Sequence, residues 1–478
     1  MDSLFDKLTS YRDLDYYAFH MPGHKRNGAV LDVDLPYGID ITEIDGFDDL
    51  HHADGILKAA QERAAQVYRA DETHFLVNGS TCGIMSAIMG CTRMGDEILV
   101  ARNSHKSVYH AMYLNELRPV YVYPKSEAEL ELNGEISAAD VKRELEAHPE
   151  VKAVMIVSPT YDGVVSDVEA IAECAHESGV PLIVDEAHGA HFGFDSHFPE
   201  NANTKGADIV IHSVHKTLPA LTQTALLHMN GRLVNRRRVE RYLHMLQTSS
   251  PSYVLMASID SCVEMLADDA RRKELFGNYV EILKVTRERL RNLKCLQLLE
   301  TEHFDPSKLV ISVRCVKGYT SRELYQELLE TYHLQMEMVT GTYVLAMTTI
   351  GDTRSGMERL GNALCEIDER LSQGDRPCGI VSRRDRPCGI VSQRDRPCGI
   401  AEVMDKKFDG ETESRTFAES IGYISTEFAY LYPPGTPILV PGERVTKEVA
   451  AVLEGYEEKG FEIEGLENKE RIEVWING

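Results

Sequence analysis

In the stretch Ile209-Val210-Ile211-His212-Ser213-Val214-His215-Lys216-Thr217, a lysine, Lys216, follows shortly after an apolar run. The run 209–212 has the length and β-branched composition of a buried strand. A lysine at the end of such a strand can lose its hydration, which lowers the pKa of its amine and makes it a nucleophile. A lone lysine here would more commonly be an exposed loop residue. The choice between a nucleophile and a loop residue therefore depends on the other motifs of the chain.

Similar apolar runs occur from about Thr73 onwards and alternate with amphipathic stretches. The other predicted strands are Thr73–Val77, Glu97–Ala101, Val120–Tyr123, Ala153–Val157 and Leu182–Val184. The helical patterns include Cys82–Cys91, Ala138–His148 and Val168–Ser178. Strands that alternate with helices predict an α/β fold with a mainly parallel sheet. Ligands bind beyond the carboxyl ends of the strands of such sheets.

The segment Asn78-Gly79-Ser80-Thr81-Cys82-Gly83 follows the first predicted strand and opens a helix. Glycine lets the backbone approach a ligand, the two hydroxyls can donate, and a helix N-terminus offers free amides and a positive dipole. Gly79, Ser80 and Thr81 therefore form a candidate phosphate site. The alternative is that Ser80 or Thr81 only caps the helix.

The segment Val184-Asp185-Glu186-Ala187-His188-Gly189-Ala190-His191 ends another predicted strand. Asp185 can face a cleft there. The alternatives are a solvated loop or a metal site built from Asp185, His188 and His191, but the neighbouring motifs require no metal, and we predict none.

These three segments occur in the chain order of a pyridoxal phosphate (PLP) site. Lys216 would hold PLP as an imine, and Asp185 would pair with the pyridinium nitrogen, which keeps the ring an electron sink. Gly79, Ser80 and Thr81 would hold the phosphate, with help from Ser213 and His215. His105, in Asn103-Ser104-His105-Lys106, follows another strand and could stack on the ring. The alternative is a buried structural histidine.

The composition restricts the class of protein. The chain has 478 residues and a net charge of −25, which disfavours nucleic acid and anionic membranes as partners. Its 10 cysteines are scattered, as suits a reducing compartment. The N-terminus lacks the apolar segment of a secretory signal, and no apolar run approaches the length of a membrane helix. We therefore expect an acidic, cytoplasmic, multidomain protein.

Composition and pattern divide the chain into five predicted segments. They are an N-terminal segment at 1–54, a ligand-binding large domain at 55–270, a small α/β domain at 271–374, a linker at 375–401 and a C-terminal domain at 402–478. The linker contains three copies of a decapeptide that begins Asp-Arg-Pro-Cys-Gly. The spacing of Cys378, Cys388 and Cys398 matches no zinc signature, so we interpret the repeat as a duplicated linker. The C-terminal domain is predicted to start, near residue 416, with a helix.

Several motifs resemble those of the Orn/Lys/Arg decarboxylase family of bacterial fold-type I PLP enzymes. They are His20-Met21-Pro22-Gly23-His24-Lys25, Thr42–His52, Ser104-His105-Lys106-Ser107, Ser213-Val214-His215-Lys216, Ser250-Pro251-Ser252-Tyr253, Tyr432-Pro433-Pro434-Gly435 and Pro441-Gly442-Glu443. The resemblance covers nearly the whole chain. It implies an aspartate-aminotransferase-like large domain and the α-decarboxylation of a basic amino acid.

The resemblance also implies roles for individual residues. Lys216 is similar to the imine lysine, Asp185 to the pyridinium partner and His105 to the stacking ring. Ser80, Thr81, Ser213 and His215 are similar to phosphate or ring contacts, and His188 lies next to the ring. The active site of this family lies at a dimer interface, so a homodimer or higher homo-oligomer is expected. Thr248, Ser249, Ser250 and Glu443 are then candidates to approach the substrate, with an ordinary exposed side chain as the alternative for Glu443.

The chain begins almost at the Met-Pro-Gly-His motif, so it resembles the shorter, biosynthetic branch of the family. That resemblance favours arginine as substrate, giving agmatine for polyamine synthesis, ahead of lysine and then ornithine. Two alternatives are another fold-type I PLP enzyme, such as an aminotransferase, and a non-catalytic paralogue that regulates a partner enzyme.

Overall fold

The computed structural model describes residues 3–14, 16–27, 34–127, 130, 132–373 and 399–476. Nearly all of the tandem decapeptide, with Cys378, Cys388 and Cys398, lies outside the described residues. Below, the large domain is 55–270, the small domain 271–373 and the C-terminal domain 399–476.

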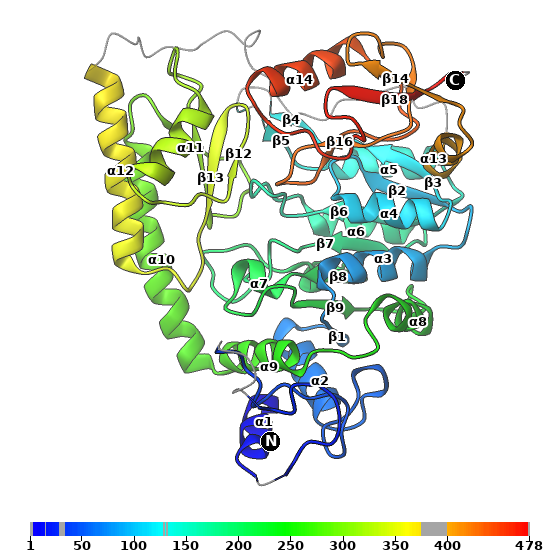
Figure 1. The fold of residues 1–478 in the computed structure, drawn as a ribbon, viewed down its shortest axis with the longest axis vertical. Helices are drawn as coiled ribbons and strands as arrows, with labels where there is room; N and C mark the ends of the chain where they lie inside the picture. The colour runs from blue at the N-terminus through cyan, green and yellow to red at the C-terminus, as the bar shows by residue number, and fades with distance from the viewer. Residues whose placement is uncertain are drawn as a thin grey trace.

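A seven-stranded sheet forms the centre of the large domain (Figure 1), with the strand order β1-β9-β8-β7-β6-β2-β3. The strands are β1 (Glu72–Leu76), β2 (Glu97–Ala101), β3 (Arg118–Val122), β6 (Val151–Val157), β7 (Leu182–Asp185), β8 (Ile209–His212) and β9 (Ala225–Met229). Neighbours from β8 to β3 pair in parallel, whereas β9 runs antiparallel to β1 and β8. The predicted α/β fold with a mainly parallel sheet is confirmed. The sequence analysis missed strand β9.

Helices cover both faces of this sheet, which explains why its strands are apolar on both sides. Along β2, Ile98 and Val100 pack on one face, and Leu99 and Ala101 pack on the other. The first face carries α3 (Gly79–Cys91), α4 (Lys106–Leu114) and α8 (Arg236–Leu246), and the second carries α5 (Ala138–Ala147) and α6 (Val168–Glu177). The predicted helices at 82–91, 138–148 and 168–178 are confirmed.

The remaining elements of this part of the chain are short or flank the sheet. They are η1 (Leu50–His52), α2 (Ile56–Tyr68), β4 (Ser126–Glu127), β5 (Leu132–Asn133), η2 (Ala202–Lys205), α7 (Val214–Thr217) and α9 (Tyr253–Ala267). The N-terminus also forms α1 (Leu4–Arg12), which the sequence analysis missed. Ser3 caps α1, and Leu4 and Leu8 are fully buried.

The small domain lies beside the large domain and is joined to it by α10 (Asp269–Arg291), the helix predicted at 275–293. Its antiparallel sheet has the order β10-β11-β13-β12. The elements are β10 (Gln297–Leu299), β11 (Lys308–Ser312), α11 (Ser321–Glu330), β12 (Met338–Val339), β13 (Tyr343–Met347) and α12 (Arg354–Gln373). The predicted strands at 309–313 and 343–347 are confirmed.

The C-terminal domain packs above the β2–β3 end of the large domain (Figure 1). Its elements are α13 (Ile400–Phe408), β14 (Thr412–Thr416), β15 (Ile424–Ser425), β16 (Ala429–Tyr430), β17 (Pro437–Leu439), α14 (Lys447–Glu458) and β18 (Arg471–Trp475). The helix predicted near residue 416 is wrong, because β14 pairs with β18 up to Thr416 and turns follow it. In the described residues we find no helix with the length and apolarity needed to cross a membrane.

Candidate active site

A cavity of about 440 Å³ lies where the three domains meet. The large domain lines it with Ser80, Asn103, His105, Asp185, His188, His215 and Lys216, among others. The small domain adds Glu337, Thr340 and Tyr343, and the C-terminal domain adds Tyr432, Pro434 and Thr436. The cavity is thus formed by residues at the carboxyl ends of β1, β2, β6, β7 and β8, together with residues of the two other domains.

Lys216 lies on the short helix α7, directly after β8. Its Nζ is 3.0 Å from Nε2 of His188. Burial lowers the pKa of the Lys216 amine, nearby Asp185 opposes that shift, and Lys308 adds to it. Burial likewise lowers the pKa of His188 well below its ordinary value, helped by the charge of Lys216. The pair therefore favours the neutral amine that a nucleophilic lysine requires.

Asp185 is the last residue of β7 and lies beside Ile211 of β8. It is 4% exposed and accepts a hydrogen bond from the Ala187 amide at 3.1 Å. Burial raises the pKa of Asp185, and Lys216 counteracts the rise. A cationic group in the cavity would stabilise the ionised form of this carboxyl.

His105 precedes α4 and holds the amide of Ser107, while its Nδ1 is 2.9 Å from the Ser107 hydroxyl. Burial, with a contribution from Lys216, lowers the pKa of His105 to about 3. The imidazole edge is close to Gly435, where an added Cβ would lie 3.3 Å from it. The ring is thus neutral and fixed, as a stacking partner should be.

The start of α3 has the features expected of an anion site. Gly79 has a φ of +73°, and its amide donates to the carbonyl of Gln223 at 2.9 Å. Asn78 occupies the cap position, and among the described residues no side chain caps this helix end. The alternative of a capping Ser80 or Thr81 is therefore wrong. Ser80 lines the cavity, whereas Thr81 is exposed and outside its lining.

Buried polar atoms around the cavity test whether PLP fits. Within the described part of the chain, the lining residues Asn103 and His188 have a buried Oδ1 and Nδ1 without a hydrogen-bond partner, and so does Oγ of Ser213, which precedes the lining residues His215 and Lys216 but is itself outside the lining. Leaving such groups unpaired is costly, so a polar ligand that meets them is expected. His215 lines the cavity and uses Nδ1 on the carbonyl of Thr224 at 2.8 Å, which leaves Nε2 for a ligand. These groups fit a phosphorylated ring.

Two carboxylates in the lining, Asp162 and Glu337, were missed by the sequence analysis. Asp162 follows β6, so the strand-end argument applied to Asp185 could have found it. Glu337 precedes the two-residue strand β12, and no local pattern singles it out.

The predicted substrate contacts are not brought into the cavity of this chain. Thr248, Ser249 and Ser250 are exposed. Thr248 receives a hydrogen bond from His51 and donates its amide to Asn78 at the start of α3.

Glu443 requires a correction, because it is neither exposed nor turned to the cavity. It is 1% exposed and binds Arg102 through both oxygens, at 2.8 and 2.9 Å. Arg102 also donates to the carbonyl of Pro437 at 2.8 Å. Glu443 therefore fastens the C-terminal domain to the end of β2.

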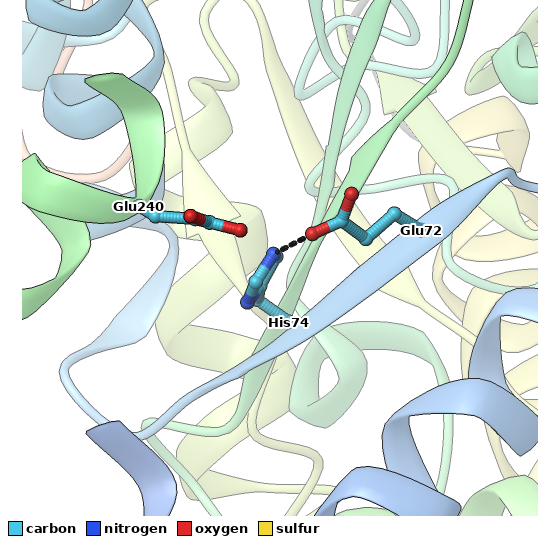
Figure 2. Close-up of side chains that lie close together, drawn as sticks. All are labelled: Glu72, His74 and Glu240. Carbon is cyan, nitrogen blue, oxygen red and sulfur yellow. Dashed lines mark hydrogen bonds and ion pairs between the residues drawn. The ribbon is translucent and has the colours of Figure 1, made fainter. Parts of the chain in front are cut away.

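The metal site considered at Asp185, His188 and His191 is not formed. His191 instead binds Asp305 at 3.1 Å, and His188 binds Lys216. The described residues do contain another cluster, in which Glu72, His74 and Glu240 keep one ligand atom each within 4.8 Å (Figure 2). Its groups already have partners, since Glu72 binds His74 at 2.8 Å and Arg236 at 3.0 Å.

The fold is the one shared by fold-type I PLP-dependent enzymes. The chain belongs to the Orn/Lys/Arg decarboxylase family. The model of the family's major domain matches residues 2–317, and that of its C-terminal domain matches residues 397–469. The protein is therefore a PLP-dependent amino acid decarboxylase.

Individual relatives agree with this assignment. Arginine decarboxylase of Bacillus subtilis (strain 168) is 34% identical over 480 residues, which cover 97% of this chain and 95% of that protein. The inducible lysine decarboxylase of Escherichia coli (strain K12) is 24% identical over 482 residues, covering 83% and 67%.

Solved structures share the fold. Lysine decarboxylase LdcF of Francisella novicida has a TM-score of 0.84 at 20% identity and covers 99% of this chain and 81% of its own. Alanine–glyoxylate aminotransferase from Nostoc sp. has a TM-score of 0.54 at 15% identity and covers 67% and 88%.

Proposed function

We propose that this enzyme converts arginine to agmatine and CO₂, with lysine and then ornithine as the next substrates to consider. The choice of arginine rests on the relatives, because arginine decarboxylases of several Bacillus species are 33–34% identical over nearly the full chain. The lysine decarboxylases are more distant, at 24–26% identity.

The observation that carries the proposal is the common cavity of Lys216, His188, Asp185 and His105. When bound, PLP supplies an electron sink for the electrons of the bond that breaks. In our proposal Lys216 bonds the cofactor, Asp185 pairs with its ring nitrogen and His105 packs on its face. The first turn of α3, with Gly79 and Ser80, holds the phosphate, and Ser213 and His215 assist; the exposed Thr81 acts through its backbone amide.

The reaction breaks the bond between Cα and the carboxyl carbon, and a proton replaces CO₂ at Cα. The hydrogen bond between Lys216 Nζ and His188 Nε2 supports a role for this pair in delivering that proton. Desolvation lowers the pKa of both groups, so neither holds its proton as tightly as it would in water. Tyr161, whose ring lies 4.4 Å from that of His188, covers the pair.

We also propose that the enzyme works as a homodimer or higher homo-oligomer in the cytoplasm. Exposed apolar side chains on the N-terminal segment support an interface, and they include Tyr16, Tyr17 and Phe19. Thr248, Ser249 and Ser250 are exposed next to α3, where they could meet a second copy of the chain. The acidic charge and scattered cysteines support the location.

To test this proposal, the purified protein is incubated with PLP and, in parallel reactions, with arginine, lysine or ornithine. The CO₂ released and the organic product are measured in each reaction. We expect agmatine and CO₂ in equal amounts, with the highest kcat/KM for arginine. A keto acid without CO₂ would instead indicate an aminotransferase. A protein that yields no product from any of the three would favour the regulatory paralogue and contradict the proposal.

A further inference from the structure

Two acidic side chains of the cavity, Glu337 and Asp162, have no part in the roles given above. We propose that they bind the cationic end of the substrate side chain, Glu337 from the small domain and Asp162 from the large domain. This inference rests on the proposed function, because it assumes a basic amino acid whose Cα lies at Lys216.

Tyr161 connects Glu337 to the reacting end of the cavity. Its ring lies 4.4 Å from His188, and Lys216 Nζ lies 6.0 Å from the ring centre. The hydroxyl at the far end of the same ring donates to Glu337. Glu337 is therefore separated from Lys216 by about one tyrosine side chain. A basic amino acid with its Cα at Lys216 extends its charged group over a comparable length.

The backbone of Glu337 is held in position, and its carboxylate can still accept hydrogen bonds from a ligand. Its amide donates to the carbonyl of Leu345 at 2.9 Å, which fixes the residue beside β13. The hydroxyl of Tyr161 uses one acceptor position of the carboxylate, and a carboxylate has about four. The side chain is exposed on the cavity side, so a ligand can reach the remaining positions.

Asp162 differs, because its half-buried carboxyl is held by a tyrosine of the small domain. The hydroxyl of Tyr343 donates to it, and burial raises the pKa of Asp162 to about 6. Ionising a buried carboxyl is unfavourable until a cation comes near. Lys308 is the cation that already favours its ionised form, and a substrate cation would add to that effect.

The two carboxylates suit a guanidinium better than an ammonium. A guanidinium is planar, has five N–H donors and binds carboxylates bidentately, so it can use two acceptors at once. An ammonium acts as a point charge. Because Asp162 and Glu337 come from different domains, a guanidinium bound by both would add to the contacts that Tyr161 and Tyr343 already make between these domains.

The experiment compares the holoenzyme with the variants Glu337→Gln and Asp162→Asn, which remove one charge each and keep the shape. Glu330→Gln is the control, since Glu330 is an exposed residue of the same small domain outside the cavity lining. We measure kcat and KM for arginine, the dissociation constant of agmatine by calorimetry, and the absorbance of bound PLP. We expect KM and the agmatine constant to rise about 10- to 100-fold in both variants, with PLP absorbance unchanged. The control should match the wild type.

Values within about twofold of the wild type in both variants would overturn the inference. The calorimetric titration with agmatine distinguishes a failure of this inference from a failure of the proposed function. If the wild type binds agmatine but releases no CO₂ from arginine, the proposed function fails, and weaker agmatine binding by the variants still supports the inference. If the wild type binds none of agmatine, cadaverine and putrescine, the inference is overturned.

Discussion

Lys216 Nζ lies 3.0 Å from Nε2 of His188, and the two residues follow neighbouring parallel strands of the central sheet. His188 is buried and Lys216 is half-buried, and burial lowers the pKa of each. A free amine beside a neutral imidazole is the state in which a lysine attacks a carbonyl carbon. This hydrogen bond is therefore the structural centre of the proposed mechanism.

Replacing Lys216 by Ala should remove both catalysis and the covalent attachment of PLP. We expect kcat to fall by more than about 10⁴-fold, as for other enzymes that lose their nucleophile. The visible absorbance band of lysine-bound PLP should disappear, which a spectrum of the reconstituted variant measures. Lys152→Ala, at an exposed position of β6, is the control and should behave as the wild type. A Lys216→Ala variant that keeps the band would contradict the assignment.

Asp185→Asn should leave the fold intact and weaken the chemistry. A neutral amide cannot stabilise a protonated ring nitrogen, so we expect kcat to fall about 100- to 1,000-fold. Initial rates with arginine measure this effect, and thermal unfolding of the apoprotein checks the fold. Unchanged kcat would show that Asp185 does not face the cofactor.

Breaking the Arg102–Glu443 pair should destabilise the junction with the C-terminal domain. Both side chains are at most 1% exposed, and Glu443→Gln leaves the Arg102 charge uncompensated in the interior. Such a loss costs about 3–5 kcal/mol of unfolding free energy. Denaturant unfolding measures it. Lys205→Met, which breaks the exposed pair with Glu169, should cause no measurable change. An equally small effect at Glu443 would argue against the buried pair.

Substrate affinity should depend on the ionisation of Asp162. Burial raises its pKa to about 6, so the carboxyl is protonated below about pH 6 and ionised above it. Lys308 favours the ionised form of Asp162, the hydroxyl of Tyr343 donates to Asp162, and the neighbouring Tyr161 donates to Glu337. A cation binds the ionised form, so kcat/KM for arginine should rise as the pH increases through about 6. The profile of Asp162→Asn should lack this step, and a step that persists would belong to another group.

Gly435→Ala should disturb the active site from the C-terminal domain. The residue has a φ of +77°, and an added Cβ would lie 3.3 Å from the ring of His105. Gly318→Ala is the matched control, because its φ is +71° and nothing lies within 4 Å of its Cβ position. Both should lose about 1 kcal/mol of stability through backbone strain. Only Gly435→Ala should also weaken PLP binding, measured by titration of the apoenzyme; equal effects would show that His105 does not need this contact.

The sequence predicts the part of the site that depends on strand ends. Lys216, Asp185, His105 and Ser80 each follow a short apolar run, and parallel strands bring such positions to one edge of the sheet. Strand β9 was missed because no candidate catalytic residue marks it in the sequence, and only its pairing with β1 and β8 reveals it. The role of each residue stays a prediction until the variants are measured.

The contributions of the other two domains could not be derived in this way. Glu337 lines the cavity because the small domain packs beside the large domain, where Glu337 accepts a hydrogen bond from Tyr161. No local sequence pattern predicts this contact between the domains. Glu443 was expected near the substrate because its carboxylate suits a cation. In the structure that cation is Arg102, 341 residues away in the chain. Long-range pairing of charges is set by packing, which composition and spacing do not reveal.

The most direct test of the central claim is to reduce the PLP-loaded protein with borohydride and find the modified lysine by mass spectrometry. Reduction makes the bond between PLP and its lysine permanent, so the modified peptide identifies the residue at the centre of the site. The account predicts modification at Lys216. Modification at Lys106 or Lys308 instead, with Lys216 unmodified, would contradict it.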